Sequence, residues 1–378
     1  MSIVIVGGGV IGCSIAYNLA KLGTKDVTIV EKDIPNHGTS TRSASRFRVH
    51  FWTEENVRFA TESRRIFLNL ASATKWNPII SIGGYLWLLP NEKHLKAFEK
   101  ANQMWARLGV AGTFFSPEET REQYPYLNTD GFVQAFFGPQ DGSLHHDYVT
   151  YGYYMASKAM GVRCVEHAEA TKITLEDGKV TGVETDQGPV KGEKVILAAG
   201  AWTADLARTV GIELPMEPVK KEILITEPFR FFLEPFIVDN GTSGYFGQTL
   251  RGEILGGIDV PVEKGLRPLN TSILCAKEWA KTVTRVVPAM KYARAFRGWS
   301  GYFDPTSDGS HILGSDPEWP RGLHVAAGFG GHGFLMAPLT GEVMARYVAF
   351  EEIPELMEPF LPTRFKEGRL VNETLVVG

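Results

Sequence analysis

Residues 3–12, IVIVGGGVIG, decide the fold of this chain. The apolar run at 3–6 leads directly into the glycine spacing G-x-G-x-x-G, and apolar positions with helical periodicity follow over residues 15–20. A second apolar run, residues 27–30, ends in Glu31. This order of strand, glycine turn, helix and strand is typical of the βαβ unit that binds dinucleotides.

Each glycine of the turn has its own steric task. Gly7 allows a tight turn, Gly9 allows the backbone to approach a pyrophosphate, and Gly12 allows the helix to pack closely on the strand. Val10 and Ile11 begin the helix, whose free N–H groups are then expected to face the phosphates.

Glu31 supplies the second half of the dinucleotide pattern. It follows Gly12 by nineteen residues, at the place where a carboxylate accepts hydrogen bonds from ribose hydroxyls. An acid there disfavours a 2′-phosphate, so NADP is not expected. The alternative is a glycine-rich turn in an ordinary α/β sheet, but that reading leaves the acid and the three glycines unexplained.

Composition restricts the class of protein. The 378 residues exceed what one hydrophobic core usually spans, which predicts two domains. A net charge of −4 gives no reason to expect nucleic-acid binding, and no apolar run approaches the ~20 residues of a membrane span. Three widely spaced cysteines indicate a reducing, cytoplasmic setting, and the sequence has no Cys-x-x-Cys pair, so no metal site is expected.

Hydrophobic periodicity places the remaining elements. Helical patterns mark residues 54–73, 92–108 and 148–160, and a C-terminal helix is expected from about Pro338. Short apolar runs bounded by turn residues predict strands at 83–89, in a hairpin over 170–185, at 194–197, across 220–260 and at 323–328.

The predicted fold class is α/β, a Rossmann-like dinucleotide-binding domain with an inserted substrate domain built on a mixed or antiparallel sheet. The dinucleotide-binding domain is expected from three separated pieces, residues 1–82, 146–212 and 296–378. The substrate domain is expected from residues 83–145 and 213–295. Such interleaving is unlike a simple nicotinamide dehydrogenase, whose cofactor domain is usually contiguous.

Four stretches of the sequence point to a family. They are residues 4–32, 38–42, 196–202 (ILAAGAW) and 326–334 (AAGFGGHGF). Together they resemble the superfamily of FAD-dependent amino-acid and amine oxidases, which includes D-amino-acid oxidase, glycine oxidase and sarcosine oxidase. Residues 38–58 are most similar to the β subunits of heteromeric L-proline dehydrogenases and sarcosine oxidases.

The resemblance implies noncovalent FAD as the cofactor. The helix that opens after Gly331 is expected to stabilise negative charge on the flavin ring. The resemblance places these residues against FAD: Gly7, Gly9, Val10, Ile11, Gly12, Glu31, Lys32, Ser40, Thr41, Arg42, Arg46, Ala170, Gly200, Trp202, Gly301, Gly328, Gly330, Gly331, His332, Gly333 and Phe334. Three alternatives stay open: residues 328–333 as a surface loop, His332 as a structural residue, and Arg42 as a solvated charge.

Departures from the family pattern shape the expected substrate site. Phe303 stands where D-amino-acid oxidase and glycine oxidase have the arginine that binds the substrate carboxylate. Gly301 and Leu335 stand where monomeric sarcosine oxidases have the flavin-linking cysteine and a carboxylate-binding lysine. A carboxylate clamp is therefore expected elsewhere, at Arg48 in preference to Arg46, because a planar guanidinium matches a carboxylate.

Two further positions bear on catalysis. Tyr245 stands where sarcosine-type enzymes place an aromatic ring over the substrate, with core packing as the alternative, and Arg48 and His332 complete the expected catalytic set. Ile254 matches the position of the lysine that activates oxygen in sarcosine oxidases. Without a cation there, slow reaction with oxygen is expected, so a dye, a quinone or a partner subunit is the expected electron acceptor.

The expected activity is an FAD-dependent dehydrogenase that oxidises the C–N bond of a small secondary amino acid, with L-proline as the first choice. Hydride passes from carbon to flavin N5, assisted by the lone pair of a neutral amine. Alternatives are a sarcosine or other N-methyl amino-acid oxidase, a D-amino-acid dehydrogenase, and a noncatalytic electron-relay subunit. The expected partners are further copies of the chain or an electron-transfer subunit, with membrane association only through that subunit.

Overall fold

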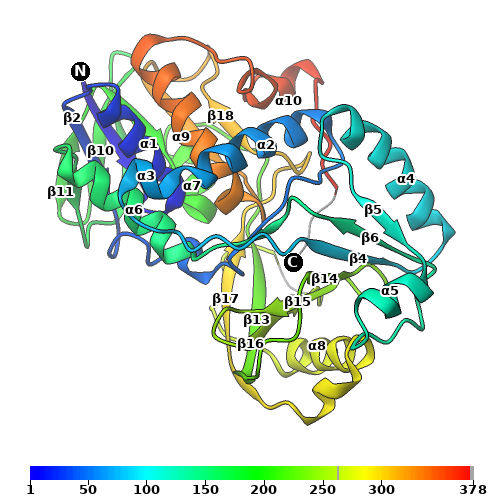
Figure 1. Cartoon of the computed structure of the whole chain (residues 1–378). Coiled ribbons are helices and arrows are strands. Elements are labelled where there is room, and N and C mark those ends of the chain that lie inside the picture. Colours follow the sequence, from blue (N-terminus) through cyan, green and yellow to red (C-terminus); the bar gives the residue numbers. More distant parts are fainter. Residues whose placement is uncertain (262–263, 375–378) are drawn as a thin grey trace.

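A six-stranded sheet carries the glycine turn. The computed structural model describes residues 1–261 and 264–374, and Figure 1 shows their arrangement. The strand order in this sheet is β18 (Ile312–Gly314), β19 (Leu323–Ala327), β12 (Lys194–Leu197), β1 (Ser2–Val6), β2 (Asp26–Val30) and β8 (Arg163–Val165). All neighbours are parallel except β18 and β19.

The predicted βαβ unit is present at the centre of this sheet. Helix α1 (Val10–Lys21) joins β1 to β2, which pair in register from Ser2 opposite Asp26 to Val6 opposite Val30. Both strands are apolar and buried because helices cover the sheet. The covering helices include α6 (His146–Ala159) and α9 (Gly333–Phe350), both of which pack on α1.

An eight-stranded, largely antiparallel sheet forms the other half of the molecule (Figure 1). Its strand order is β17 (Ala295–Phe303), β13 (Val219–Pro228), β16 (Glu253–Ile258), β15 (Gly244–Gln248), β14 (Phe236–Asp239), β4 (Tyr85–Leu89), β6 (Gln134–Gly138) and β5 (Thr113–Phe115). Within the described part of this sheet, the β14–β4 pair is parallel and the other pairs are antiparallel. The predicted domain boundary at residue 296 falls at the start of β17, which pairs along its length with β13 of this sheet.

Alternation along β4 separates the two faces of the eight-stranded sheet. Tyr85 and Trp87 join the large core cluster that also contains Phe98 and Trp105 of α4 (Glu92–Arg107). Leu86 and Leu88 point to the opposite face, which α8 (Ile273–Val286) covers. Successive side chains of a strand point to opposite faces of the sheet, so those of β4 pack alternately against α4 on one face and α8 on the other.

Smaller elements complete the chain. The predicted hairpin forms a three-stranded sheet of β9 (Ala170–Glu176), β10 (Lys179–Thr185) and β11 (Gly188–Lys191), and β3 (Arg46–Phe47) pairs with β7 (Gly142–Ser143). The other helices are α2 (Glu54–Leu68), α3 (Leu70–Thr74), α5 (Pro117–Gln123), α7 (Thr203–Arg208), α10 (Arg364–Glu367) and the short 3₁₀ turns η1 (Thr39–Arg42), η2 (Gly200–Trp202), η3 (Pro288–Tyr292) and η4 (Glu358–Phe360). None of the helices in the described ranges is long and apolar enough to cross a bilayer.

The C-terminal helix starts where the family resemblance implies, after Gly331, and not at about Pro338, where the sequence pattern predicts it. It begins at Gly333, and Pro338 lies inside it rather than at its start. The Ser63 hydroxyl of α2 donates to Leu335 O (2.7 Å) and accepts from the Leu339 N–H (3.2 Å). A side chain from a distant segment thus inserts into the hydrogen-bond ladder beside the proline, which allows the helix to continue through it.

Candidate functional site

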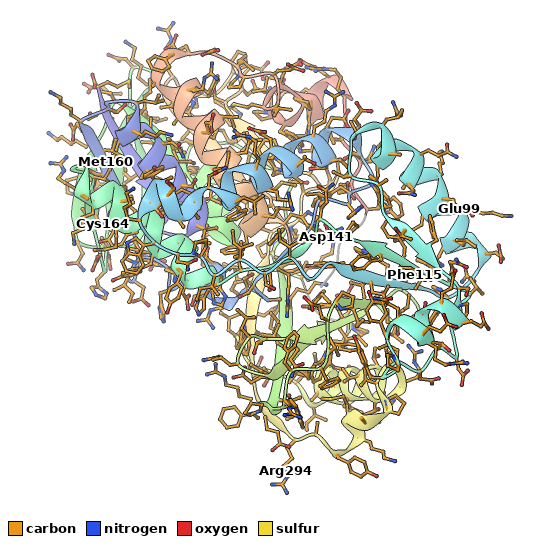
Figure 2. All side chains as sticks on the ribbon, in the orientation of Figure 1. Glu99, Phe115, Asp141, Met160, Cys164 and Arg294 are labelled. Carbon is orange, nitrogen blue, oxygen red and sulfur yellow. The ribbon has the colours of Figure 1, made fainter. Side chains whose placement is uncertain are left out.

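A cavity of about 540 Å³ lies between the two large sheets. One end is lined by the glycine turn after β1, and the other by aromatic side chains of the eight-stranded sheet. Figure 2 labels Asp141 near the junction of the two halves of the molecule. Most of the predicted cofactor residues line it: Gly7, Gly9, Val10, Ile11, Glu31, Lys32, Ser40, Arg42, Arg46, Ala170, Gly200, Trp202, Gly301, Gly330, Gly331, His332, Gly333 and Phe334.

Three predicted cofactor residues are not among the described lining residues. Gly12 lies behind the turn, where a Cβ would overlap Gly7 O. The Thr41 hydroxyl donates instead to Asp147 (2.8 Å), and the Gly328 N–H donates to Asp304 (3.0 Å). Gly12 and Gly328 therefore allow the backbone to take its local shape, and Thr41 connects η1 to α6 by a hydrogen bond.

The turn end of the cavity presents backbone donors. Gly9 caps α1 without a side-chain acceptor, and the Val10 N–H bonds to Ser40 Oγ (2.9 Å). Glu31 accepts the Gly8 N–H (2.7 Å), which holds the carboxylate against the turn. An uncapped helix N-terminus beside a glycine turn is suited to a diphosphate.

Two cations stand beside this end. The Lys32 ammonium lies 3.4 Å from the centroid of the Trp202 ring, and both side chains line the cavity. The Arg42 guanidinium donates to Ser300 O (3.4 Å), so Arg42 joins η1 to β17 rather than extending freely into solvent.

A buried network surrounds Arg48. Its Nη1 donates to His50 O (2.9 Å), and its Nη2 lies 2.9 Å from His332 Nε2. The guanidinium can only donate, so Nε2 of His332 must be the accepting nitrogen of a neutral ring. His50 Nδ1 in turn lies 2.8 Å from Asp141, which also accepts the Val49 N–H (2.8 Å). Burial lowers the pKa of Arg48 from its usual value.

Arg46 has a different environment two residues earlier. Its guanidinium lies 4.6 Å from the centroid of the Phe236 ring, and Nη2 donates to Gln248 O (3.1 Å). The Nε is buried and has no hydrogen-bond partner among the residues that the structure describes. Burial lowers the pKa of Arg46 to about 10. The structure shows no hydrogen bond from Nη1 to a described residue, so this cation in the cavity wall is a candidate for binding an anion through Nη1.

Aromatic rings enclose the Arg46 end of the cavity. The rings of Tyr85 and Phe236 lie 4.8 Å apart, and those of Phe236 and Tyr245 lie 5.9 Å apart. Burial raises the pKa of Tyr245, so its hydroxyl stays protonated. Tyr85 and Phe236 were missed by the sequence analysis because a buried aromatic strand residue gives no signal that separates a cavity wall from a core.

Asp304 is a second residue that the sequence analysis missed. It lines the cavity directly after β17 and accepts the backbone N–H groups of Gly328 and Gly330, both at 3.0 Å. Burial raises the pKa of its carboxyl to about 7. The carboxyl therefore fixes the glycine-rich loop that leads into α9. A carboxylate immediately after a strand that ends at the cavity was the available signal.

The expectation for Ile254 is wrong. Ile254 packs in the cluster on the α8 face, with Phe246 and Trp279, and is not among the described residues that line the cavity. Lys221 of β13 does line the cavity, pairs with Asp259, and lies 5.6 Å from the Phe303 ring centroid. Cations do line the cavity, at Lys221, Arg46 and Arg48, so slow reaction with oxygen does not follow from Ile254.

The described residues fit FAD. The turn end offers N–H donors, a carboxylate and cations for the diphosphate and ribose. The far end offers glycine backbone at Gly330, Gly331 and Gly333 and the N-terminus of an 18-residue helix, suited to a flat ring that gains negative charge. Among the described residues, no group of histidine, cysteine or acidic side chains forms a metal site.

Comparisons with known proteins find similar sequences and similar structures along nearly the whole chain. A family model described as "DAO: FAD dependent oxidoreductase" matches residues 2–347. Sarcosine oxidase subunit beta of Rhodobacter capsulatus is 27% identical over 383 residues, which cover 100% of this chain and 91% of that protein. Glycine oxidase of Geobacillus kaustophilus is 29% identical over 371 residues, 96% of each chain. L-proline dehydrogenase from P. horikoshii superposes with a TM-score of 0.90 at 29% identity, over 98% of both chains. The chain therefore belongs to the DAO family of FAD-dependent oxidoreductases.

Proposed function

We propose that the protein is an FAD-dependent amino-acid dehydrogenase that oxidises the C–N bond of a small secondary amino acid, specifically L-proline. The observation that carries this proposal is the pairing of a dinucleotide turn with a buried arginine, Arg46, at opposite ends of one cavity. The similarity to L-proline dehydrogenase along 98% of both chains supports the choice of amino acid.

Arg46 is the better carboxylate clamp of the two arginines. The Nη atoms of Arg48 are directed at His50 O and His332, whereas Arg46 donates only from Nη2 among the described residues, which leaves its Nη1 for a ligand in the cavity. A carboxylate at Arg46 would satisfy that donor in a charge-assisted hydrogen bond. We therefore reverse the order expected from the sequence: Arg46 binds substrate, and Arg48 acts as a positioning residue for His332.

The side chains of this cavity would orient the substrate rather than exchange protons with it. FAD held by the glycine turn and the backbone at Gly330, Gly331 and Gly333 would supply the hydride acceptor. Arg46 would fix the carboxylate, and the rings of Tyr85, Phe236 and Tyr245 would exclude water and favour the neutral amine. The positive end of the α9 dipole, beside His332, favours negative charge at the far end of the cavity.

An oxidase is the second candidate. Lys221 lines the cavity, and a cation there would stabilise the superoxide formed when oxygen takes an electron. A similar protein, sarcosine oxidase subunit beta, is an oxidase component by name. That name also motivates the proposal that this chain assembles with a different subunit that receives its electrons. Rapid reoxidation of reduced enzyme by air would favour the oxidase, and rapid reoxidation only by a dye would favour the dehydrogenase.

The clamp can be tested with a substrate panel. Anaerobic flavin reduction is followed with L-proline, D-proline, sarcosine and pyrrolidine, which lacks the carboxylate, in the wild type and in Arg46→Gln. Loss of charged hydrogen bonds worth roughly 3 kcal/mol lowers the second-order rate constant for L-proline by about 100-fold. The pyrrolidine rate should stay within about twofold. Equal losses for both compounds would show that Arg46 does not act through the carboxylate.

A further inference from the structure

A second cavity, of about 710 Å³, opens between α4 and strands β4 and β14 of the eight-stranded sheet. Aromatic rings line its inner part, and basic side chains of α4 line its outer part. The described lining residues are Trp52, Trp87, Lys93, His94, Ala97, Phe98, Lys100, Ala101, Met104, Val238, Asn240, Ser243 and Thr374.

The two cavities share one face of the sheet. Tyr85 and Phe236 are paired across β4 and β14 and line the first cavity. Trp87 and Val238 are the next pair on the same face and line the second. Two residues along a strand span roughly 6.5 Å, so the cavities are neighbours along the sheet.

Side chains make the contacts between the two cavities. The Arg48 guanidinium lies 4.4 Å from the ring centroid of Phe51, which lines the first cavity, and 5.5 Å from that of Trp87, which lines the second. The rings of Tyr85 and Trp87 stack at 6.0 Å. Packed side chains, and no strand, therefore separate the two cavities.

The second cavity is suited to anions. Lys93, His94 and Lys100 line it, and none of its described lining residues is acidic. Glu99 of α4 projects outward from the helix (Figure 2), and it is not a lining residue. The nearby carboxylate of Glu373 accepts the Trp52 N–H (2.9 Å).

Trp87 adds a polar group to the apolar wall. Its side chain is 0% exposed, and its Nε1 has no hydrogen-bond partner in the described part of the chain. The Trp87 N–H is closed to the cavity in this structure, and it could meet a passing oxygen only if the indole ring rotates.

We infer that the second cavity is an entrance through which a small carboxylate reaches the Arg46 end of the first cavity. The cofactor would fill the turn end of the first cavity, so the substrate needs a separate route. The basic side chains of α4 would concentrate anions at the mouth and raise the association rate. Only the identity of the carboxylate rests on the proposed amino-acid dehydrogenase activity.

The test uses benzoate, a carboxylate with no amine to oxidise, and the FAD-loaded enzyme. Its association and dissociation are followed by stopped flow through the change in flavin absorbance. The variant Lys93→Gln/Lys100→Gln should lower the association and dissociation rate constants together by at least about threefold at low ionic strength. Lys96→Gln, on α4 but not lining the cavity, is the matched control and should leave both unchanged.

A second variant blocks the passage sterically. Ala97 is exposed and lines the cavity, so Ala97→Trp should slow both association and dissociation by at least tenfold. Ala106→Trp, at an exposed position of α4 outside the cavity, is its control. Wild-type rates in both the charge and the Ala97 variants would overturn the proposal and point to entry elsewhere, as would failure of benzoate to perturb the flavin.

This test separates the entrance from the proposed function. If no amino acid reduces the wild-type flavin, the proposed dehydrogenase activity fails, but the benzoate rates still decide the entrance. If L-proline reduces the flavin and the benzoate rates do not respond to the variants, the entrance fails and the activity stands.

Discussion

Gly9 provides a sharp test of the dinucleotide turn. Its φ of −77° and ψ of −177° are accessible to any residue, so Gly9→Val places no strain on the backbone. A Cβ there would lie 3.2 Å from Ser40 Oγ, which accepts the Val10 N–H. Loss of that hydrogen bond costs about 1 kcal/mol of folding stability. The fold of the apoprotein should therefore survive the substitution.

The same valine should greatly weaken FAD binding. Its methyl groups would occupy the space through which a diphosphate approaches the N–H groups of the turn. Losing two charge-assisted hydrogen bonds of about 1.5–3 kcal/mol each raises the dissociation constant by roughly 10²–10⁴-fold. Gly12→Val should behave differently, because its Cβ would overlap Gly7 O and lower apoprotein stability by about 3 kcal/mol or more.

The assay combines FAD titration of the apoprotein with its thermal unfolding. Gly9→Val should shift the apoprotein Tm by only about 1–2 °C while its flavin affinity collapses. Gly12→Val should instead lower the Tm of the apoprotein itself, before any effect on flavin binding is considered. A Gly9→Val protein that purifies with full flavin absorbance would refute the reasoning, and so would a Gly12→Val apoprotein as stable as the wild type.

Three further predictions concern buried groups. The pKa of Asp304 is raised to about 7 from 3.8, so its contribution to apoprotein stability is full below pH 4 and falls by about 4 kcal/mol as the pH rises through 7. In denaturant titrations from pH 4 to 8, the stability of Asp304→Asn should lack this fall. Parallel stability curves for the variant and the wild type would contradict the prediction. Ser63→Ala leaves two groups of α9 without their partner and should cost about 1–3 kcal/mol, measured as Tm, with an unchanged Tm opposing the account. Arg364→Met breaks the buried ion pair with Asp308 and should lower the free energy of unfolding in urea by about 3–5 kcal/mol. The double variant Arg364→Met/Asp308→Ala should recover part of that loss, because no unpaired charge stays buried. If the double variant recovers nothing, the broken ion pair is not the cause of the loss.

The parts of the fold that were predictable are those fixed by local spacing. The strand, turn and helix after Ile3 follow from residues adjacent in sequence, as does the hairpin centred on Gly178. Periodicity alone misplaced the start of α9 at Pro338, because Ser63, from a helix far away in sequence, supplies hydrogen bonds beside that proline. The start after Gly331 was implied only by the family resemblance. A proline usually ends or begins a helix, but here contacts with a distant segment allow the helix to continue through it.

The substrate site was less predictable than the cofactor site. Arg46 and Arg48 are two residues apart and both line the cavity. Which of them has an unused donor depends on partners such as His332, 284 residues from Arg48. The prediction that Ile254 lies at the site was wrong because β16 pairs with β13 through an irregular register. A change of one residue in register moves a strand side chain to the opposite face of the sheet.

The central claim is that this chain oxidises an amino acid with its own FAD. Anaerobic titration of the FAD-loaded protein with L-proline, followed by flavin absorbance, tests it most directly. The account predicts bleaching of the flavin by L-proline, then fast recovery with a dye and slow recovery in air. Bleaching by sarcosine or a D-amino acid alone would keep the chemistry and contradict proline. An unchanged flavin spectrum with every one of these amino acids would contradict the claim and favour a subunit that only relays electrons.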